Sequence, residues 1–317
     1  MRRIPAVLAV LGLSALTLVG CSSATSADGC EPNAPADAVL DTVAVSGETG
    51  APAVTLSAPV YVDQTVGQVV TAGDGLAITS DAQDVGFSIT IANGATGQTI
   101  LTSAATTQSV AAWRTDLNGL ADLFQCATAG SRVVGAIPVS EISEAAAQSW
   151  GVSEGQALVV AIDVQDVYLA AADGAPQYNS DSGLPQVVLA PDGRPGLIIP
   201  DSAPPSDLVV QVLKKGDGAA VTADDSIRVH YTGVIWDDST VFDSTWAAGA
   251  STSVTLDAVV AGFATALEGQ TIGSQILVVV PPDQGYGDDG SGSVPGGATL
   301  VYVIDVLGVD PPTTDAQ

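Results

Sequence analysis

Aromatic residues are scarce in this 317-residue chain, yet half of them fall in one stretch. Seven of the fourteen Phe, Trp and Tyr residues lie between Tyr231 and Tyr302. Asp243 directly follows Phe242 there, and an acid beside an apolar wall needs a partner, which the hydroxyl of Tyr286 would supply. These residue types predict a dry aromatic pocket with a hydrogen-bond donor. A plain packed core is the alternative for Phe242 and Tyr302.

Two other motifs are weaker. Residues 285–290 read GYGDDG and satisfy G-x-G-x-x-G, but they follow PPDQ rather than a strand, and their two acids would repel a pyrophosphate. His230 is the single histidine and would need a serine and an acid nearby to form a catalytic triad. Strand alternation turns it away from Tyr231, so we expect a surface strand residue. With so few ligands, we expect no Cys/His metal site.

Strands and one short helix are predicted around the aromatic stretch. Ile227, Val229 and Tyr231 alternate with polar residues, as in a half-buried strand. Apolar residues then fall on one face of a short helix that Gly269 would end: Val259, Val260, Phe263 and Leu267. An antiparallel sheet laid over a single helix is an α+β arrangement.

The same order of elements occurs twice. GSRVVGAIP at 130–138 is matched by GSQILVVVP at 273–281, and the triplet GDG at 73–75 recurs at 216–218 with the same spacing. ALVVAIDV, which begins at Ala157, is matched by TLVYVIDV, which begins at Thr299. Three phrases in one order indicate an internal duplication. We predict domains over 51–170 and 195–311, a turn-rich linker over 171–194 and a tail over 312–317.

Motifs in the second copy resemble those of FKBP-type peptidyl-prolyl isomerases. They are VHYTG at 229–233, FDST at 242–245, PDQGYG at 282–287 and VPGGATLVYVIDVL at 294–307, and the resemblance covers about 208–309. It implies an α+β fold of two FKBP-like domains, each an antiparallel β-sheet wrapped around a short α-helix. It also implies an apolar pocket between sheet and helix. The residues that it places there are Tyr231, Phe242, Asp243, Val259, Val260, Phe263, Tyr286 and Tyr302.

The activity implied by the resemblance is rotation about a prolyl peptide bond, which needs no nucleophile, metal or cofactor. Amide resonance sets a barrier of ~18–20 kcal/mol. A slot of Phe242, Phe263 and Tyr302 would grip the proline ring and strip water from the preceding carbonyl, while Tyr286 would donate to the rotated carbonyl. Asp243 would hold neighbouring hydroxyls. The implied partners are proline-containing polypeptides, and macrolides are implied ligands.

Several positions depart from the family pattern. Phe263 stands where members often carry tryptophan, and the strand before the helix, Thr252–Leu256, lacks an aromatic residue. Trp246 and Ala248 stand where others often place basic residues. A wider slot and a weaker enzyme are therefore expected.

The first copy keeps the scaffold phrases without the pocket. Aligning the two copies on their shared phrases gives these correspondences: Tyr231 with Ser88 or Ile89, Phe242-Asp243 with Leu101-Thr102, and Tyr286, counted from the shared prolines, with Ser143. The first copy is therefore expected to be an FKBP-like fold that has lost its site.

The N-terminus predicts export. Two arginines precede an apolar run from Ile4 to Val19, which is shorter than the ~20 residues of a membrane span. Leu18-Val19-Gly20-Cys21 resembles a bacterial lipobox, in which Cys21 is acylated after removal of residues 1–20; an ordinary secretory signal is the alternative. We expect a lipid-anchored tether over 21–50 and a protein held on the outer face of the bacterial cell membrane.

The net charge limits the possible partners, and the cysteines raise the question of a disulfide. The chain has 8 Lys and Arg against 35 Asp and Glu, a net charge of −27, so nucleic acid is not an expected partner. Cys30 and Cys126 remain after Cys21 is assigned. In an oxidising compartment they form either a disulfide or two buried thiols, and both alternatives stay open.

The first hypothesis for function is a prolyl isomerase that assists the folding of exported proteins at the cell envelope. The aromatic pocket favours it. The alternative is a non-catalytic chaperone or assembly scaffold in which both copies serve as docking surfaces, and the degenerate first copy supports this alternative. A solute-binding lipoprotein is a more distant third.

Overall fold

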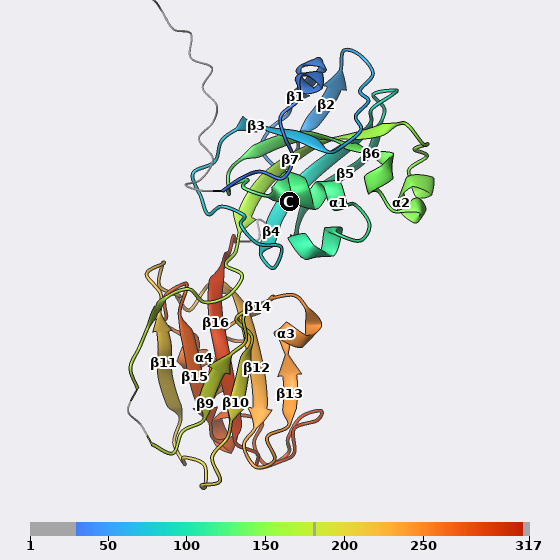
Figure 1. The fold of residues 1–317 in the computed structure, drawn as a ribbon. Helices are drawn as coiled ribbons and strands as arrows, with labels where there is room; N and C mark the ends of the chain where they lie inside the picture. The colour runs from blue at the N-terminus through green and yellow to red at the C-terminus, as the bar shows by residue number, and fades with distance from the viewer. Residues whose placement is uncertain (1–29, 180–181, 313–317) are drawn as a thin grey trace, which may run out of the picture.

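The computed structural model describes residues 30–179 and 182–312 and contains two large antiparallel β-sheets, each with short helices (Figure 1). The predicted signal peptide, the acylation site at Cys21 and the start of the tether lie outside the described residues, as do residues 313–317 of the tail. In the part of the chain that is described, no helix is long and apolar enough to cross a membrane.

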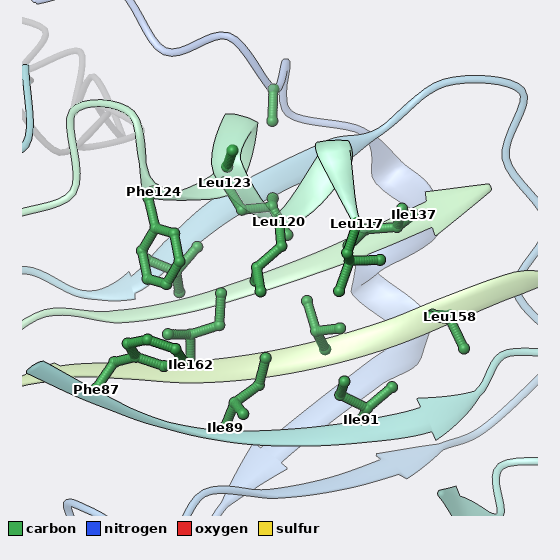
Figure 2. Close-up of a cluster of buried hydrophobic side chains, with 14 of the residues drawn as sticks. Phe87, Ile89, Ile91, Leu117, Leu120, Leu123, Phe124, Ile137, Leu158 and Ile162 are labelled. Atoms are coloured by element: carbon green, nitrogen blue, oxygen red, sulfur yellow. The ribbon is translucent and has the colours of Figure 1, made fainter. Parts of the chain in front are cut away.

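Five strands form the first sheet in the order β3-β6-β7-β4-β5. Helix α1 (Asn118–Phe124) packs against it, and Leu120 and Phe124 share a buried core with Ile89 of β4 (Figure 2). The strands are β3 Val66–Thr71, β4 Asp84–Asn93, β5 Thr99–Ser109, β6 Arg132–Pro138 and β7 Ala157–Val167. The other helical segments are the 3₁₀ turns η1 Ala38–Thr42, η2 Val110–Trp113 and η3 Val139–Glu141, and helix α2 Glu144–Ser149.

The second sheet has the order β13-β12-β16-β15-β11-β8, with β14 also paired to β12. Helix α4 (Ala261–Leu267) buries Phe263 and Leu267 against it. The strands are β8 Ala175–Pro176, β11 Val209–Lys215, β12 Ser226–Ile235, β13 Val241–Ser244, β14 Thr252–Thr255, β15 Gln275–Val280 and β16 Leu300–Asp310. The shorter helical segments are α3 Thr245–Ala248 and η4 Pro282–Gln284.

The two sheets repeat one topology. The order β5-β4-β7-β6-β3 of the first corresponds to β13-β12-β16-β15-β11 of the second, and each order is followed with the same antiparallel pairing. The register also repeats: Gly233 pairs with Tyr302 in the second sheet, and the equivalent residues of the first sheet, Ile91 and Val160, pair in the same way. The predicted fold class, two domains with an antiparallel sheet and a short helix each, is confirmed.

Each sheet is also covered on its outer face by a β-hairpin. Strands β1 (Val43–Ser46) and β2 (Ala53–Leu56) lie over the first sheet, and β9 (Gln186–Leu189) and β10 (Pro195–Ile198) lie over the second. Gly50 and Gly193 occupy equivalent positions in the two hairpin turns and have positive φ angles of 88° and 91°.

Strand β9 and the turn of the second hairpin lie within 171–194, which was predicted to be a linker, and β10 begins at the start of the predicted domain. Val187 and Leu197 pack against Leu277 and Val301 of the sheet, and β8 adds a short edge strand. The turn-forming residues of this segment suggested a loop, but the central strands are buried on both faces and so need a second apolar cover. The repeated unit is therefore a hairpin followed by a sheet.

Cys30 and Cys126 are joined by a disulfide with a Cα–Cα distance of 5.7 Å. Cys126 directly follows the C-cap residue of α1 and has a φ of 67°, at the position where the second copy places Gly269 with a φ of 75°. The bridge closes a long loop, since the two cysteines are 96 residues apart. It ties the segment before β1 to the helix of the first copy.

Loss of this bridge should destabilise the first copy. Closing a loop of this length removes unfolded-state entropy worth about 4.7 kcal/mol, and measured losses are usually smaller, so Cys30→Ser should lower the free energy of unfolding by about 2–4 kcal/mol. Denaturant titration of the oxidised and reduced protein measures the effect. Cys21→Ser is the control, because it leaves the pair intact. Equal stability of the wild type with and without reductant would contradict the prediction.

Candidate active site

Four aromatic rings from separate elements meet between the second sheet and α4. Phe263 of α4 and Tyr302 of β16 lie edge to face with ring centroids 5.1 Å apart. Phe242 of β13 contacts Tyr302 at 5.6 Å, and Tyr231 of β12 contacts Phe263 at 5.7 Å. Each pair has the perpendicular geometry that aromatic rings prefer. We call these four residues the aromatic slot.

Strand register explains how the slot forms. Residues two apart on one strand share a face, so Tyr231 and Gly233 of β12 lie on one side of the sheet. Gly233 pairs with Tyr302 on β16. Phe263 is 3% exposed and Tyr302 is 4% exposed, whereas Tyr231 and Phe242 are only half-buried. The slot therefore has a buried floor and open walls.

The two valines before α4 extend the apolar lining. Val260 is the N-cap residue of the helix, and it and Val259 are half-buried against the same core as the rings. The sequence-predicted apolar residues thus come together around one site.

Gly233 makes the close approach of the rings feasible. A Cβ atom at this position would lie 2.6 Å from the Cζ of Phe242 and 3.0 Å from the ring of Tyr302. Gly233 ends the VHYTG motif at 229–233, and the motif alone does not predict this role. Glycine in the interior of a strand is itself a signal that another group approaches closely.

A hydrogen bond joins two of the predicted site residues. The hydroxyl of Tyr231 donates to Oδ2 of Asp243, an exposed carboxylate on β13. Tyr286 was predicted to be the partner of this acid, so the prediction named the wrong tyrosine. Tyr231 lies on the strand that pairs directly with β13, whereas Tyr286 belongs to the loop after η4.

Burial keeps the hydroxyls of the slot protonated. Burial raises the pKa of Tyr231 above its usual range, and its hydrogen bond to Asp243 raises this pKa further. Burial also raises the pKa of Tyr302, and the nearby hydroxyls of Tyr286 and Tyr231 add to the effect. Both side chains are therefore hydrogen-bond donors at neutral pH.

Tyr286 lies at the exposed edge of the site. Its side chain is 37% exposed, and its carbonyl accepts from the backbone N–H of Gly290 at 3.2 Å. The turn places it close enough to influence the pKa of Tyr302. A hydroxyl at this edge is placed to reach a ligand held over the rings.

The remaining aromatics of this stretch lie away from the slot. Trp236 is buried on the hairpin side of the sheet, where its Nε1 donates to the carbonyl of Ser202 at 3.1 Å. Trp246 stacks on His230 with ring centroids 4.2 Å apart. Four of the seven aromatics form the slot, and Tyr286 lies at its edge.

His230 was predicted to be a surface residue, and this is wrong. The residue is 6% exposed, and its Nδ1 lies 2.9 Å from the hydroxyl of Thr245. Burial lowers its pKa to about 4, although the charge of Asp84 from the first copy opposes this shift. Alternation correctly turned His230 away from the slot, but α3 and the first copy cover that face as well.

Aliphatic side chains fill the corresponding space in the first copy. At the paired positions where the second copy has Gly233 and Tyr302, the first copy has Ile91 and Val160. Ile91 is 2% exposed and Val160 is 0% exposed. Figure 2 shows Ile89 and Ile91 of the sheet beneath Leu120 of α1, so the first copy has a packed core in place of a slot.

The first copy also lacks the equivalents of Phe242, Asp243 and Tyr286. The strand pairing places Ile100 and Leu101 opposite β4 where the second copy has Phe242 and Asp243. This corrects the sequence alignment by one residue, because Gly233 pairs with Asp243 and the equivalent Ile91 pairs with Leu101. Ser143 stands where Tyr286 does and instead caps α2, accepting a hydrogen bond from the N–H of Ala146 at 3.3 Å.

A sheet wrapped around a helix, with an aromatic slot between them, defines a binding domain for an apolar ring. The family model for FKBP-type peptidyl-prolyl cis-trans isomerase matches residues 218–307, within the second copy. The chain is 32% identical over 114 residues to a probable FK506-binding protein of Corynebacterium glutamicum, covering 36% of this chain and 97% of that relative. The chain therefore belongs to the FKBP-type peptidyl-prolyl cis-trans isomerase family, and its isomerase domain is the second copy.

Two larger relatives each match part of this chain. The chain is 36% identical over 112 residues to the isomerase FkpA of Aeromonas hydrophila, which covers 35% of this chain and 41% of that protein. The crystal structure of FkpA from Escherichia coli is 30% identical in sequence and has a TM-score of 0.32, covering 41% of this chain and 53% of that one.

Adding one methyl group at Gly233 should close the slot. Gly233→Ala places a Cβ against Phe242 and Tyr302, and overpacking of this kind costs about 1–3 kcal/mol. We expect kcat/KM for a prolyl peptide to fall at least about tenfold, because the rings must move apart or into the site.

A glycine in a roomier strand provides the control. A Cβ at Gly196 of β10 would meet only a backbone oxygen, at 3.6 Å. Gly196→Ala should therefore leave kcat/KM unchanged. Activity and melting temperature are measured together for both variants, and wild-type activity in a well-folded Gly233→Ala protein would contradict the assignment of the slot.

Proposed function

We propose that the second copy isomerises prolyl bonds in exported polypeptides at the cell envelope, with the aromatic slot as the proline site. The observation that carries this proposal is the four-ring slot itself, with a tyrosine hydroxyl at its edge. The first copy, which has the same fold, has a packed core at the same place. Membership of the isomerase family supports the same reaction.

The slot geometry suits a reaction that only twists an amide. A proline ring lying on Phe263 and Tyr302 excludes water from the adjacent carbonyl. Loss of those hydrogen bonds disfavours the planar, resonance-stabilised amide relative to the twisted form. A hydroxyl that meets the carbonyl only after rotation then favours the transition state, and each ~1.4 kcal/mol gives a factor of ten in rate. Tyr286 is the residue we assign to this donor.

Asp243 and Tyr231 have a supporting role. Asp243 accepts the hydrogen bond from Tyr231, which directs that hydroxyl toward the edge strand instead of into the slot. The bond fixes both the ring of Tyr231 and the end of β13 that carries Phe242. We therefore assign Asp243 to the positioning of the slot wall.

Export and lipid anchoring complete the proposal. The N-terminal signal, the lipobox-like stretch ending in Cys21 and the polar tether support it. The disulfide in the first copy is of a kind that persists in oxidising compartments. The clients would be unfolded exported chains whose prolyl bonds isomerise slowly without catalysis.

The slot would also take a macrolide. Two relatives are named FK506-binding proteins, those of Corynebacterium glutamicum and Streptomyces anulatus. A rigid ligand that presents a saturated ring and a carbonyl fits the same apolar floor as a prolyl segment. FK506 is therefore proposed as a competitive ligand of the second copy.

A second function rests on the first copy. Its core is complete and its fold is retained although its slot is filled by Ile91 and Leu120. A domain kept without a site serves as a docking or supporting unit, and in that case the protein acts as a chaperone or scaffold. Isomerase activity in the second copy separates this alternative from the first proposal.

Removing the hydroxyl of Tyr286 or the carboxylate of Asp243 should reduce catalysis more than stability. Tyr286→Phe loses one transition-state hydrogen bond, so kcat/KM should fall about tenfold. Asp243→Ala leaves the hydroxyl of Tyr231 without its acceptor and should lower kcat/KM by a similar factor. A protease-coupled assay on a short X-Pro peptide measures both in the mature protein.

Leu101 supplies the matched control for these variants. It holds the position of Asp243 in the first copy and is 40% exposed. Leu101→Ala should therefore leave kcat/KM unchanged. Unchanged activity in a well-folded double variant of Asp243 and Tyr286 would mean that the site lies elsewhere.

The anchor is tested separately. Cys21→Ser should release the protein into the medium or leave its signal peptide uncleaved, because no thiol remains for acylation. Mass spectrometry of the mature wild-type protein should show an acylated Cys21 as its first residue. A mature N-terminus at any other residue argues for an ordinary secretory signal.

A further inference from the structure

The two copies are joined by a buried polar contact between Asp84 and Ser251. Asp84 begins β4 of the first copy and is 5% exposed. Its Oδ2 accepts a hydrogen bond from the backbone N–H of Ser251 in the second copy at 3.2 Å, and the hydroxyl of Ser251 donates to the same oxygen. A buried carboxylate held by two donors fixes the positions of both segments that it joins.

The charge of Asp84 also reaches a buried ring of the second copy. Its charge acts on His230, which is buried and stacks on Trp246 with ring centroids 4.2 Å apart. Trp246 belongs to α3, the short helix directly after β13. Helix α3 ends at Ala248, so Ser251 lies just beyond it, and Asp84 bonds to the loop that follows the helix.

Helix α3 is in turn bonded to a wall of the slot. The hydroxyl of Thr245, its first residue, accepts from the backbone N–H of Tyr231 at 2.9 Å and lies 2.9 Å from Nδ1 of His230. Tyr231 then donates its own hydroxyl to Asp243. Asp84 is therefore linked to the backbone of Tyr231 through Ser251, the chain of α3 and the hydroxyl of Thr245.

The structure assigns to Asp84 a positioning role in the active site of the other copy. We propose that the first copy, whose own slot is filled, holds α3 and β13 in place and thereby sets the width of the aromatic slot. This inference rests on the isomerase function proposed above. It gives the first copy a role in catalysis without a catalytic residue.

The need for such support follows from the place of β13 in the sheet. This strand has four residues, Val241–Ser244, and pairs with β12 at the sheet edge. Short edge strands are among the segments that open most readily. Phe242 lies on β13, so any loosening of the strand moves one ring of the slot. Fixing the helix that follows the strand limits this motion.

General stabilisation of the fold is the competing explanation. The buried acid Asp163 allows a comparison, because it forms its ion pair with Arg132 within the first copy, at 2.5 Å. Ser253 lies close to Ser251 in the chain and bonds to Ser226 of the second copy, at 2.7 Å. Changing either control residue disturbs a similar local interaction without touching the contact between the copies.

The experiment compares kcat, KM and melting temperature in the full mature chain. Asp84→Ala should lower kcat/KM about fivefold, mostly through kcat, because the slot is loosened and not blocked. Ser251→Ala should lower it by a smaller factor, because the backbone N–H of residue 251 still donates to Asp84. The double variant should lose no more than Asp84→Ala alone, since that change already removes both hydrogen bonds. Asp84→Asn keeps an acceptor for Ser251 and should restore most of the activity. Asp163→Asn and Ser253→Ala should leave kcat/KM unchanged.

A spectroscopic measurement reports on the contact directly. The chain holds one histidine, so the imidazole resonances of His230 are unambiguous by NMR. In Asp84→Ala, these resonances and the amide of Tyr231 should shift, whereas in Asp163→Asn they should not.

The outcomes separate the inference from the proposed function. An inactive wild-type protein would overturn the isomerase proposal. An active wild type with unchanged kcat/KM in folded Asp84→Ala and Ser251→Ala would overturn the positioning role. So would an equal loss of activity in the Asp163 or Ser253 control variants.

Discussion

The antiparallel register between β12 and β16 fixes which two residues meet where the site of the second copy forms. It sets Gly233 opposite Tyr302, which leaves space beside a ring that α4 closes from the other side. The same register in the first copy sets Ile91 opposite Val160, and these two buried aliphatic side chains fill the space that is open in the second copy. One backbone arrangement thus yields either a slot or a packed core, and the choice depends on side-chain volume at paired positions.

The open slot exposes apolar surface that the first copy buries. Tyr231 and Phe242 remain half-buried, so the second copy forgoes part of the hydrophobic stabilisation that a filled core provides. Two features limit the loss. The perpendicular ring contacts support one another, and the hydrogen bond from Tyr231 to Asp243 fixes the more exposed wall. A site of this kind is stable only when its surroundings hold it, as preorganised sites require.

Much of this site was predictable because its motifs are local. The phrases around Tyr231, Phe242 and Tyr302 fix which strands carry the rings, and the apolar pattern of α4 fixes the floor. The partner of Asp243 was not predictable, because two tyrosines offered the same hydroxyl and only strand pairing distinguishes them. The close approach of Phe242 and Tyr302 to Gly233 was also not predicted, because a glycine in a motif does not show which ring approaches it.

The errors outside the site have one physical cause. Alternation of apolar and polar residues predicts which side of a strand faces the core, but it assumes that the other side meets water. Here the outer faces are covered by the hairpins β1–β2 and β9–β10, and His230 is covered by α3 and the first copy. A sheet covered on both faces has few free surfaces through which two copies can meet. The contact between Asp84 and Ser251 therefore forms near the end of α3, where a shift of the first copy acts on the edge strand that carries Phe242.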